Sequence, residues 1–160
     1  MQIRRATKGD IEGIDKLLCQ VLEIHASGRP DIFKAGTKKY SDAELCDILA
    51  CEDTPIFVAT EQDTVQGYAF CVIKRVENNS ILRDRCELYI DDLCVDSSAR
   101  GGGIGTLLFE YVKGYAYDIG CDAITLNVWS LNDSAMRFYE KCGFEPLKVV
   151  MEKKLHPDGE

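Results

Sequence analysis

The sequence lacks any long apolar run. No segment approaches the roughly 20 apolar residues that a membrane-spanning helix requires, and the start Met1-Gln2-Ile3-Arg4-Arg5 lacks the apolar stretch of a signal peptide. We therefore expect a cytoplasmic protein with no membrane partner. The 160 residues also contain no repeat, linker or low-complexity segment. This length and uniformity predict one domain over residues 1–155, followed by a short polar tail at 156–160.

Paired cysteine motifs are also absent. The eight cysteines form no Cys-x-x-Cys pair and are scattered through apolar, periodic segments, at positions 19, 46, 51, 71, 86, 94, 121 and 142. This pattern predicts reduced thiols buried in the core, rather than a disulfide framework or a metal site.

Positive charge is in short supply. The chain has 19 lysines and arginines against 27 aspartates and glutamates, for a net charge of −8 and a pI near 4.8. Such a charge argues against nonspecific binding to nucleic acid and favours a cationic partner through long-range attraction. It is compatible with an amine substrate.

Hydrophobic periodicity and turn residues predict a mixed order of strands and helices. The predicted strands are 2–6, 56–60, 65–76, 86–95 and 123–129, with one or more final strands within 144–155, and the predicted helices are 9–24, 41–51, 104–119 and 133–142. The second helix begins with Ser41-Asp42-Ala43-Glu44, which has the form of a capping box.

The most informative segment is Arg100-Gly101-Gly102-Gly103-Ile104-Gly105, between the apolar run 88–95 and the helix at 104–119. Glycines let the backbone approach a ligand closely, and the free N–H groups at a helix start attract anions. A strand, a glycine turn and a helix in this order are suited to binding a diphosphate.

Two familiar nucleotide motifs do not match this segment. A dinucleotide fingerprint would need a glycine where Thr106 stands, and no Gly-Lys-Ser/Thr follows as in a nucleoside triphosphate loop. A structural turn without a ligand remains an alternative from this segment alone.

The second half of the chain resembles the GNAT superfamily of acyl-CoA-dependent N-acetyltransferases. Val95 and the glycine segment are similar to the family's strand-ending valine and its Arg/Gln-x-x-Gly-x-Gly/Ala loop. The block from Asn132 to Phe144 is similar to the family's Asn-x-x-Ala-x-x-Phe-Tyr-x-x-x-Gly-Phe. The resemblance implies a GNAT α/β (α+β) fold, in which a mixed, mostly antiparallel sheet with splayed central strands carries helices on both faces.

The resemblance also implies acetyl-CoA as cofactor and a set of residues that bind it. Backbone groups of Leu93 and Val95, with Cys94 between them, would bind the pantetheine amides as an added strand does. Asn132 would reach the same arm, although a helix N-cap is an equally good interpretation of this asparagine. The diphosphate would lie on the glycine segment, at Arg100, Gly101, Gly102, Gly103, Ile104, Gly105 and Thr106.

Catalytic candidates follow from the same resemblance. Tyr139 matches the family tyrosine that protonates the leaving thiolate, which is general-acid chemistry. The proton of the attacking amine would go to a carboxylate, and the candidates are Asp91 first, Asp92 second and Glu87 third. The adjacent pair Asp91-Asp92 is similar to the acidic pair of polyamine acetyltransferases. Strict alternation places Glu87, Asp91, Leu93 and Val95 on one face of the strand and Asp92 and Cys94 on the other, unless a bulge shifts them.

These features predict an N-acetyltransferase that transfers acetyl directly, in a ternary complex, to the primary amine of a small cationic acceptor. Protein lysine or N-terminal acetylation is an alternative, although Asn127 stands where N-terminal acetyltransferases often have a glutamate. A CoA-binding module without turnover and nucleotide binding by the glycine loop are further alternatives. Residues 25–40, which include His25, would set specificity, and a homodimer is compatible with the resemblance.

Overall fold

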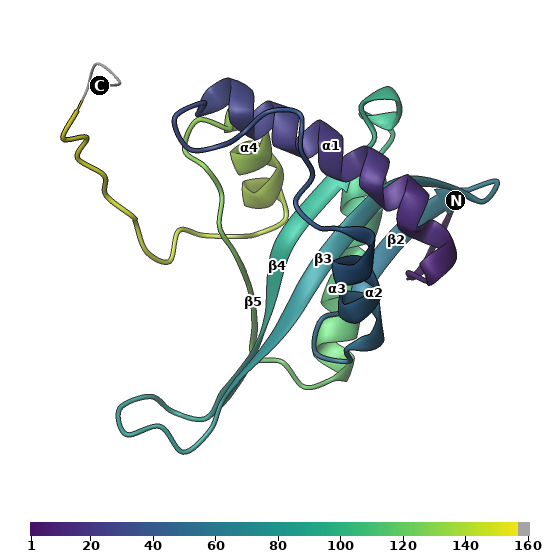
Figure 1. Ribbon diagram of the computed structural model, residues 1–160. Helices are drawn as coiled ribbons and strands as arrows, with labels where there is room; N and C mark the ends of the chain where they lie inside the picture. The colour runs from purple at the N-terminus through teal and green to yellow at the C-terminus, as the bar shows by residue number, and fades with distance from the viewer. Residues whose placement is uncertain (157–160) are drawn as a thin grey trace.

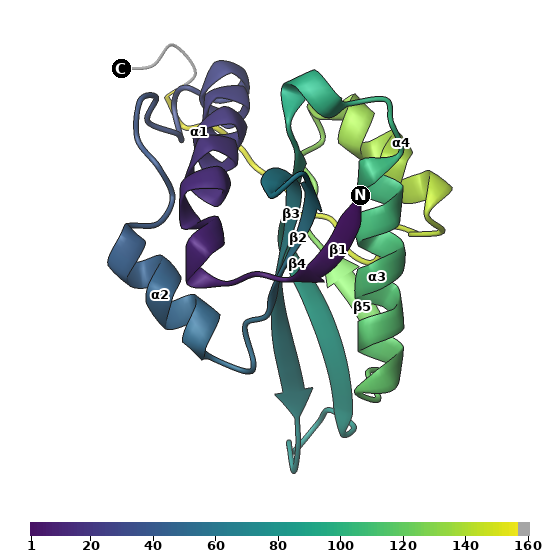
Figure 2. The same cartoon turned by 90° about the vertical axis from the view of Figure 1, so that its right-hand side faces the viewer.

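The computed structural model describes residues 1–156 and has one five-stranded sheet with helices on both faces (Figures 1 and 2). The strands are β1 (Gln2–Arg5), β2 (Ile56–Glu61), β3 (Thr64–Val76), β4 (Arg85–Val95) and β5 (Ala123–Leu126). The helices are α1 (Ile11–Gly28), α2 (Asp42–Ala50), α3 (Ile104–Asp118) and α4 (Asp133–Lys141), with short 3₁₀ turns η1 (Lys8–Asp10) and η2 (Ser97–Ala99). The mixed fold predicted from the sequence is therefore confirmed.

The strands lie in the order β1-β2-β3-β4-β5. The first four pair antiparallel, and β5 pairs parallel to β4. The β4–β5 pairing runs only from Glu87 opposite Ala123 to Ile90 opposite Leu126. The remainder of β4, residues 91–95, has β3 as its strand neighbour on one side only, which is the splayed arrangement that the sequence predicted.

Two apolar layers cover the two faces of the sheet. Helices α1 and α2 pack Ile14, Leu17 and Leu45 against one face, and α3 packs Phe109 and Val112 against the other, with α4 beside it (Figure 2). These side chains lie three or four residues apart, as an amphipathic helix requires. The sheet is therefore buried on both faces in its central part.

The helix boundaries agree with the sequence to within a turn. The capping box of α2 is present, since Glu44 N–H donates to Ser41 Oγ at 3.2 Å and Ser41 N–H to Glu44 Oε2 at 2.7 Å. Helix α1 is longer than the predicted 9–24 and ends at Gly28. Within residues 1–156, no helix is both long and apolar enough to cross a membrane.

The expectation of eight buried thiols is only partly correct. Cys71 and Cys94 are buried, Cys46, Cys86, Cys121 and Cys142 are half-buried, and Cys19 and Cys51 are exposed. Cys19 and Cys51 are exposed because they lie on the outer side of α1 and at the end of α2, where periodicity carries them off the apolar stripe. All eight are free.

Strand β5 is shorter than the predicted 123–129. It ends at Leu126, and residues 127–132 form a loop in which Asn132 N–H bonds the Trp129 carbonyl at 2.9 Å. A strand persists only where a neighbour satisfies its backbone. The chain leaves the sheet where β4 stops being that neighbour.

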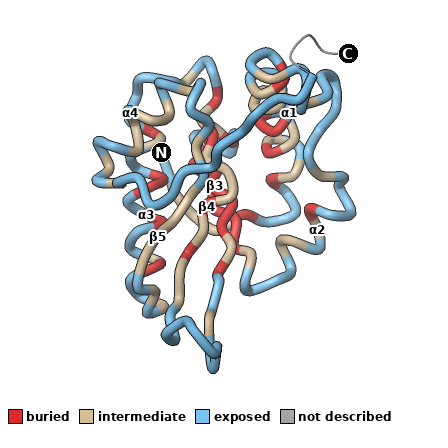
Figure 3. The backbone as a smooth tube through the Cα atoms, turned by 90° about the vertical axis from the view of Figure 1, so that its left-hand side faces the viewer, coloured by how far each residue is buried: buried red, intermediate tan, exposed pale blue. Residues whose placement is uncertain are grey.

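The prediction of a final strand within 144–155 is wrong for this structure. Residues 144–156 contain no strand, and in Figure 1 the yellow segment leaves α4 and runs apart from β5 toward the C-terminal end of α1. Figure 3 shows this segment as exposed almost throughout. It makes no strand here because it lies beside no other strand. Of the predicted polar tail, residues 157–160 lie outside the described part of the chain.

Gly67 provides a test of how closely α3 packs on the sheet. A Cβ at this position would lie 2.9 Å from the Cys94 carbonyl oxygen and 3.0 Å from Leu108 Cδ1. We expect Gly67→Ala to lower the free energy of unfolding by about 1–3 kcal/mol, because the α3 contact must shift. Gly114→Ala is the matched control, since that exposed glycine of α3 has open space around it and alanine should raise stability by about 0.5–1 kcal/mol. Urea denaturation of both variants measures the difference, and equal effects would contradict this packing.

Candidate functional site

A β-bulge at Asp91 sets the geometry of the candidate site. Ile90 pairs with Cys71 and Asp92 with Phe70, so Asp91 has no partner on β3. The extra residue reverses the alternation expected for an unbroken strand. As a result, Asp91 and Asp92 both bond side chains on the α1–α2 side of the sheet, whereas Leu93 and Val95 pack on the α3 side. This differs from the strictly alternating prediction, which separated the two carboxylates and grouped Asp91 with Leu93 and Val95.

Asp92 lies in an apolar setting beside a tyrosine. The Tyr68 hydroxyl donates to Asp92 Oδ2 at 2.6 Å, and Tyr68 is itself fully buried against Phe70. Burial raises the pKa of Asp92, and the hydrogen bond from Tyr68 opposes this shift without cancelling it. The carboxylate of Asp92 is thus a stronger base than an exposed one.

Asp91 has two polar partners from the loop between α1 and α2. Lys39 Nζ lies 2.8 Å from Asp91 Oδ2, and the Tyr40 hydroxyl donates to the same oxygen at 3.1 Å. Burial lowers the pKa of Lys39, but the hydrogen bond to Asp91 and the attraction of nearby negative charge together outweigh burial and leave the pKa above its usual value. The ring of Tyr40 stacks on Phe70 at 5.6 Å, which fixes the loop over the sheet.

Tyr139 reaches the same region from helix α4. Its ring packs between Phe138 and Phe144 at centroid distances of 5.2 and 5.6 Å. Burial raises the pKa of Tyr139 well above 10, and the nearby Asp92 carboxylate raises it further. The phenol is therefore protonated at neutral pH, as a proton donor must be.

The backbone of β4 beyond Ile90 is available for an added strand. Leu93, Cys94 and Val95 pair with Ala69, Tyr68 and Gly67 on the β3 side, and β5 has already ended on the other side. Burial raises the pKa of the Cys94 thiol to about 12, and its Sγ lies 4.0 Å from the Leu17 carbonyl oxygen. Cys94 is therefore an un-ionised core residue that contributes backbone groups to this edge.

The glycine turn has the backbone shape that its sequence indicates. Gly101 and Gly103 have φ of +86° and +80°, in the left-handed region that favours glycine, and a Cβ at either would meet no atom within 4 Å. Gly103 is the N-cap of α3 and has no side chain to cap the helix. The first N–H groups of α3, which include those of Ile104, Gly105 and Thr106, are thus free to bind an anion.

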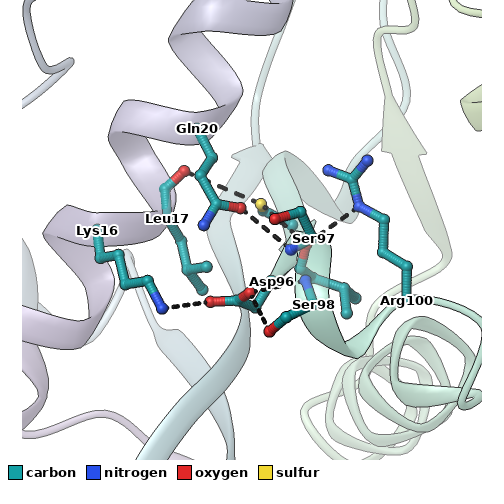
Figure 4. Close-up of polar contacts among 9 residues, drawn as sticks. Lys16, Leu17, Gln20, Asp96, Ser97, Ser98 and Arg100 are labelled. Atoms are coloured by element: carbon teal, nitrogen blue, oxygen red, sulfur yellow. Dashed lines mark hydrogen bonds and ion pairs between the residues drawn. The ribbon is translucent and has the colours of Figure 1, made fainter.

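A buried carboxylate anchors the turn to α1 (Figure 4). Asp96 is 3% exposed, lies 2.8 Å from Lys16 Nζ and accepts hydrogen bonds from the backbone and hydroxyl of Ser98 at 2.9 and 2.7 Å. The bond to Lys16 and those from Ser98 hold the pKa of Asp96 well below its usual range. Gln20 Oε1 accepts from Ser97 N–H at 3.2 Å, and Arg100 Nε bonds the Val95 carbonyl at 3.4 Å.

Two hollows lie beside α1. A groove of about 560 Å³ is lined by α1 residues together with Ser97 and Arg100. A smaller pocket of about 140 Å³ is lined by Ile24, His25, Gly28, Arg29, Phe33, Trp129, Leu131 and Asn132. His25, Phe33 and Trp129 contact one another there edge to face. Asn132 caps α4, with Oδ1 accepting from Ala135 N–H at 3.1 Å, and also lines this pocket.

The structure brings together some of the sequence-derived candidates and adds others. Glu87 lies four residues from Asp91 along β4, about 13 Å for an extended strand, and its nearest cation is Arg85 at 3.9 Å. Lys39, Tyr40 and Tyr68, which contact the two aspartates, were not singled out from the sequence. Their positions carry no motif, and only the folding of the α1–α2 loop over β3 reveals them.

The chain is similar to known acetyltransferases. Residues 20–144 match the family model described as the acetyltransferase (GNAT) family. The chain is 36% identical over 121 residues to a Drosophila melanogaster protein described as a probable N-acetyltransferase san. This match covers 74% of this chain and 62% of that protein. The chain thus spans less than two thirds of that relative's length.

Solved structures show the same fold. A mutant form of the BH1408 protein from Bacillus halodurans superposes with a TM-score of 0.93 at 33% identity, covering 97% of this chain and 99% of that one. The aminoglycoside N-acetyltransferase AAC(6')-Iy, solved in complex with CoA, superposes with a TM-score of 0.70 at 18% identity, covering 96% and 98% of the two chains. Members of this family use acetyl-CoA. By the family match over residues 20–144, the chain belongs to the GNAT family of acetyltransferases.

Proposed function

We propose that this protein transfers an acetyl group from acetyl-CoA to the primary amine of a small cationic acceptor. The observation that carries the proposal is the bulge at Asp91, which puts two carboxylates on one face of β4 where the strand has lost its β5 neighbour. Asp92, with its raised pKa, and Tyr139, with its protonated phenol, supply a base and an acid. Family membership supports the type of reaction.

The residues of the glycine turn fit the diphosphate of acetyl-CoA. Left-handed Gly101 and Gly103 have open space at their Cβ positions, and the α3 N-terminus supplies free N–H groups and a positive dipole end. We assign the diphosphate to Arg100–Thr106 and the pantetheine amides to the backbone of Leu93 and Val95. When bound, acetyl-CoA supplies the thioester from which the acetyl group is transferred.

Gly103 tests this assignment. We expect Gly103→Asp to abolish CoA binding, because a carboxylate would lie against the diphosphate. Gly103→Asn is the matched control, since asparagine has nearly the same size, tolerates a positive φ and carries no charge. Isothermal titration should give a measurable CoA affinity for Gly103→Asn. The CoA affinity of Gly103→Asp should be at least tenfold lower than that of Gly103→Asn. Equal affinities for the two variants would place the diphosphate elsewhere.

The proton of the attacking amine is assigned to Asp92, with Asp91 as its neighbour. Asp92 has the raised pKa and lies close enough to Tyr139 to raise the pKa of that phenol. Asp91 is already paired with Lys39 and bonded by Tyr40, which suits it to attract and position an ammonium group. Activity is then lost at low pH, when Asp92 becomes protonated. Because the pKa of Asp92 is raised, this loss begins at a higher pH than the usual pKa of an aspartate would give.

Direct transfer fits the state of the nearby thiol. A relay through Cys94 would need its thiolate, but burial raises the pKa of that thiol to about 12 and the side chain packs against α1. The amine therefore attacks the thioester itself, and Tyr139 supplies a proton to the departing sulfur.

Tyr139→Phe tests the acid. We expect kcat to fall by about 10²- to 10⁴-fold, as for the loss of a general acid, with CoA affinity unchanged within a factor of about three. Steady-state kinetics and CoA titration separate the two effects, and Tyr117→Phe, at an exposed position of α3, should change neither. A Tyr139→Phe enzyme with normal kcat would support a site without this acid.

The acceptor assignment follows from the charges around Asp91. The carboxylate holds a primary ammonium group, that of Lys39, at 2.8 Å, so its surroundings suit such a group. Two similar proteins are named for amine-bearing small molecules, an Arabidopsis thaliana glucosamine 6-phosphate N-acetyltransferase and the aminoglycoside enzyme. The net charge of −8 also attracts a cationic acceptor.

Lys39 and Lys38 form a matched pair for testing this idea. Lys39→Met frees Asp91, and we expect the KM for a polyamine acceptor to fall several-fold because the acceptor no longer competes with the lysine. Lys38→Met removes the same charge one residue away, where Lys38 binds Asp15 and Asp42 instead, and should leave KM unchanged. Equal KM values for the two variants would argue against Asp91 as the acceptor site.

A turnover assay tests the function as a whole. Purified protein with acetyl-CoA is offered polyamines, aminoglycosides, amino acids, and lysine or N-terminal peptides, and thiol release is recorded. We expect release stimulated by small cationic amines. Stimulation by peptides alone would favour protein acetylation, and CoA binding without release by any class would favour a binding module.

A further inference from the structure

Two cysteines that are 35 residues apart in the sequence lie side by side in the fold. Cys86 is near the start of β4, and Cys121 lies between α3 and β5. Their sulfur atoms are 2.9 Å apart, and both residues are half-buried, so the pair is partly accessible to solvent. The pair lies at the end of β4 opposite the one that leads to the glycine turn, and it is not part of the candidate acetyl-transfer site.

The backbone holds both cysteines in place. Helix α3 ends in a Schellman-type turn, in which Gly120 has a φ of +79° and Cys121 N–H bonds the Ala116 carbonyl at 2.9 Å. Asp122 then joins this turn to β4, because its N–H bonds the Cys86 carbonyl at 2.7 Å and its Oδ2 accepts from Cys86 N–H at 2.9 Å. The contact between the two thiols is therefore a consequence of how α3, β4 and β5 are connected.

The surroundings of the pair indicate which thiol reacts first. Burial raises the pKa of the Cys121 thiol, and the hydrogen bond with Cys86 raises it further, while the guanidinium of Arg75, which lies opposite Cys86 on β3, opposes the rise. The thiolate of Cys121 is thus scarce at neutral pH. Because a thiolate is the nucleophile in thiol–disulfide exchange, the first attack belongs to Cys86.

We propose that Cys86 and Cys121 form a reversible intramolecular disulfide by exchange with a low-molecular-weight disulfide such as oxidised glutathione. The sulfur atoms need to approach by only about 1 Å to reach the S–S bond length of about 2.05 Å. Cys86 loses its proton, attacks one sulfur of the reagent and releases one thiol. Cys121 then loses its proton, attacks the mixed disulfide at the Cys86 sulfur and releases the second thiol. The protein thiols give up two electrons and two protons, and the reagent takes them up.

The bond would close a covalent loop around the proposed cofactor-binding segment. The loop from Cys86 to Cys121 contains most of β4, the glycine turn and α3. The residues that we assign to acetyl-CoA, at 93–95 and 100–106, all lie inside it. A disulfide stabilises a fold mainly by limiting the freedom of the unfolded chain, and it does so more for a longer loop. Oxidation should therefore make the domain harder to unfold.

Peptide mapping after oxidation tests the pairing. The full chain is treated with oxidised glutathione under native conditions, the remaining thiols are alkylated, and the protein is digested with trypsin. We expect a crosslink between the peptides 86–100 and 114–137, located at Cys86 and Cys121 by fragmentation. The intact protein should be lighter by two hydrogen atoms, and dithiothreitol should reverse the change.

Single serine variants test both the partners and the order of attack. Cys86→Ser and Cys121→Ser should each lack the crosslink, whereas Cys46→Ser, at a half-buried position of α2, should retain it. Cys121→Ser should accumulate a glutathione adduct at Cys86. Cys86→Ser should carry at least about tenfold less adduct at Cys121, because that thiol is rarely ionised. Equal adducts in the two variants would overturn the assigned order of attack.

Thermal unfolding shows whether the bond forms in the native fold. We expect the oxidised protein to unfold about 5 °C or more above the reduced one. Dithiothreitol should remove this rise, and Cys86→Ser should not show it. Three results would overturn the proposal: glutathione adducts at Cys86 without a bond to Cys121, a disulfide between other cysteines instead, or an oxidised protein with no rise in unfolding temperature. The last result would mean that the bond forms only in a distorted or unfolded chain.

Discussion

The end of the β4–β5 pairing after Ile90 is the constraint on which the candidate site depends. Backbone N–H and C=O groups away from water must find partners, and residues 91–95 of β4 have a strand partner on the β3 side alone. This edge ends at Val95, from which the chain passes through η2 into the glycine turn before α3. A ligand with amide groups, such as a pantetheine arm, would complete it, and the chemistry would then lie beside Asp91 and Asp92.

The bulge at Asp91 gives the two adjacent carboxylates different surroundings on the same face of the sheet. Without it they would lie on opposite faces of the strand. With it, both lie on the α1–α2 side, yet Asp92 is held by a buried tyrosine and Asp91 by a lysine and a tyrosine from a loop. Burial raises the pKa of Asp92, and a buried carboxylate with a raised pKa is typical of acid–base sites. One local irregularity of the backbone thus brings together the two carboxylates that we propose as base and as acceptor contact.

The sequence by itself determined the order of elements, the glycine turn and the family, because these depend on local periodicity, left-handed glycines and motifs within a few residues of one another. Tertiary structure decided the rest. The face on which Asp91 and Asp92 lie depends on a bulge against β3, and the contacts of Lys39, Tyr40 and Tyr68 depend on a loop that folds over the sheet. Whether residues 144–155 form a strand depends on a neighbouring strand. A strand, unlike a helix, has no internal hydrogen bonds, so no local pattern can specify whether a partner is present.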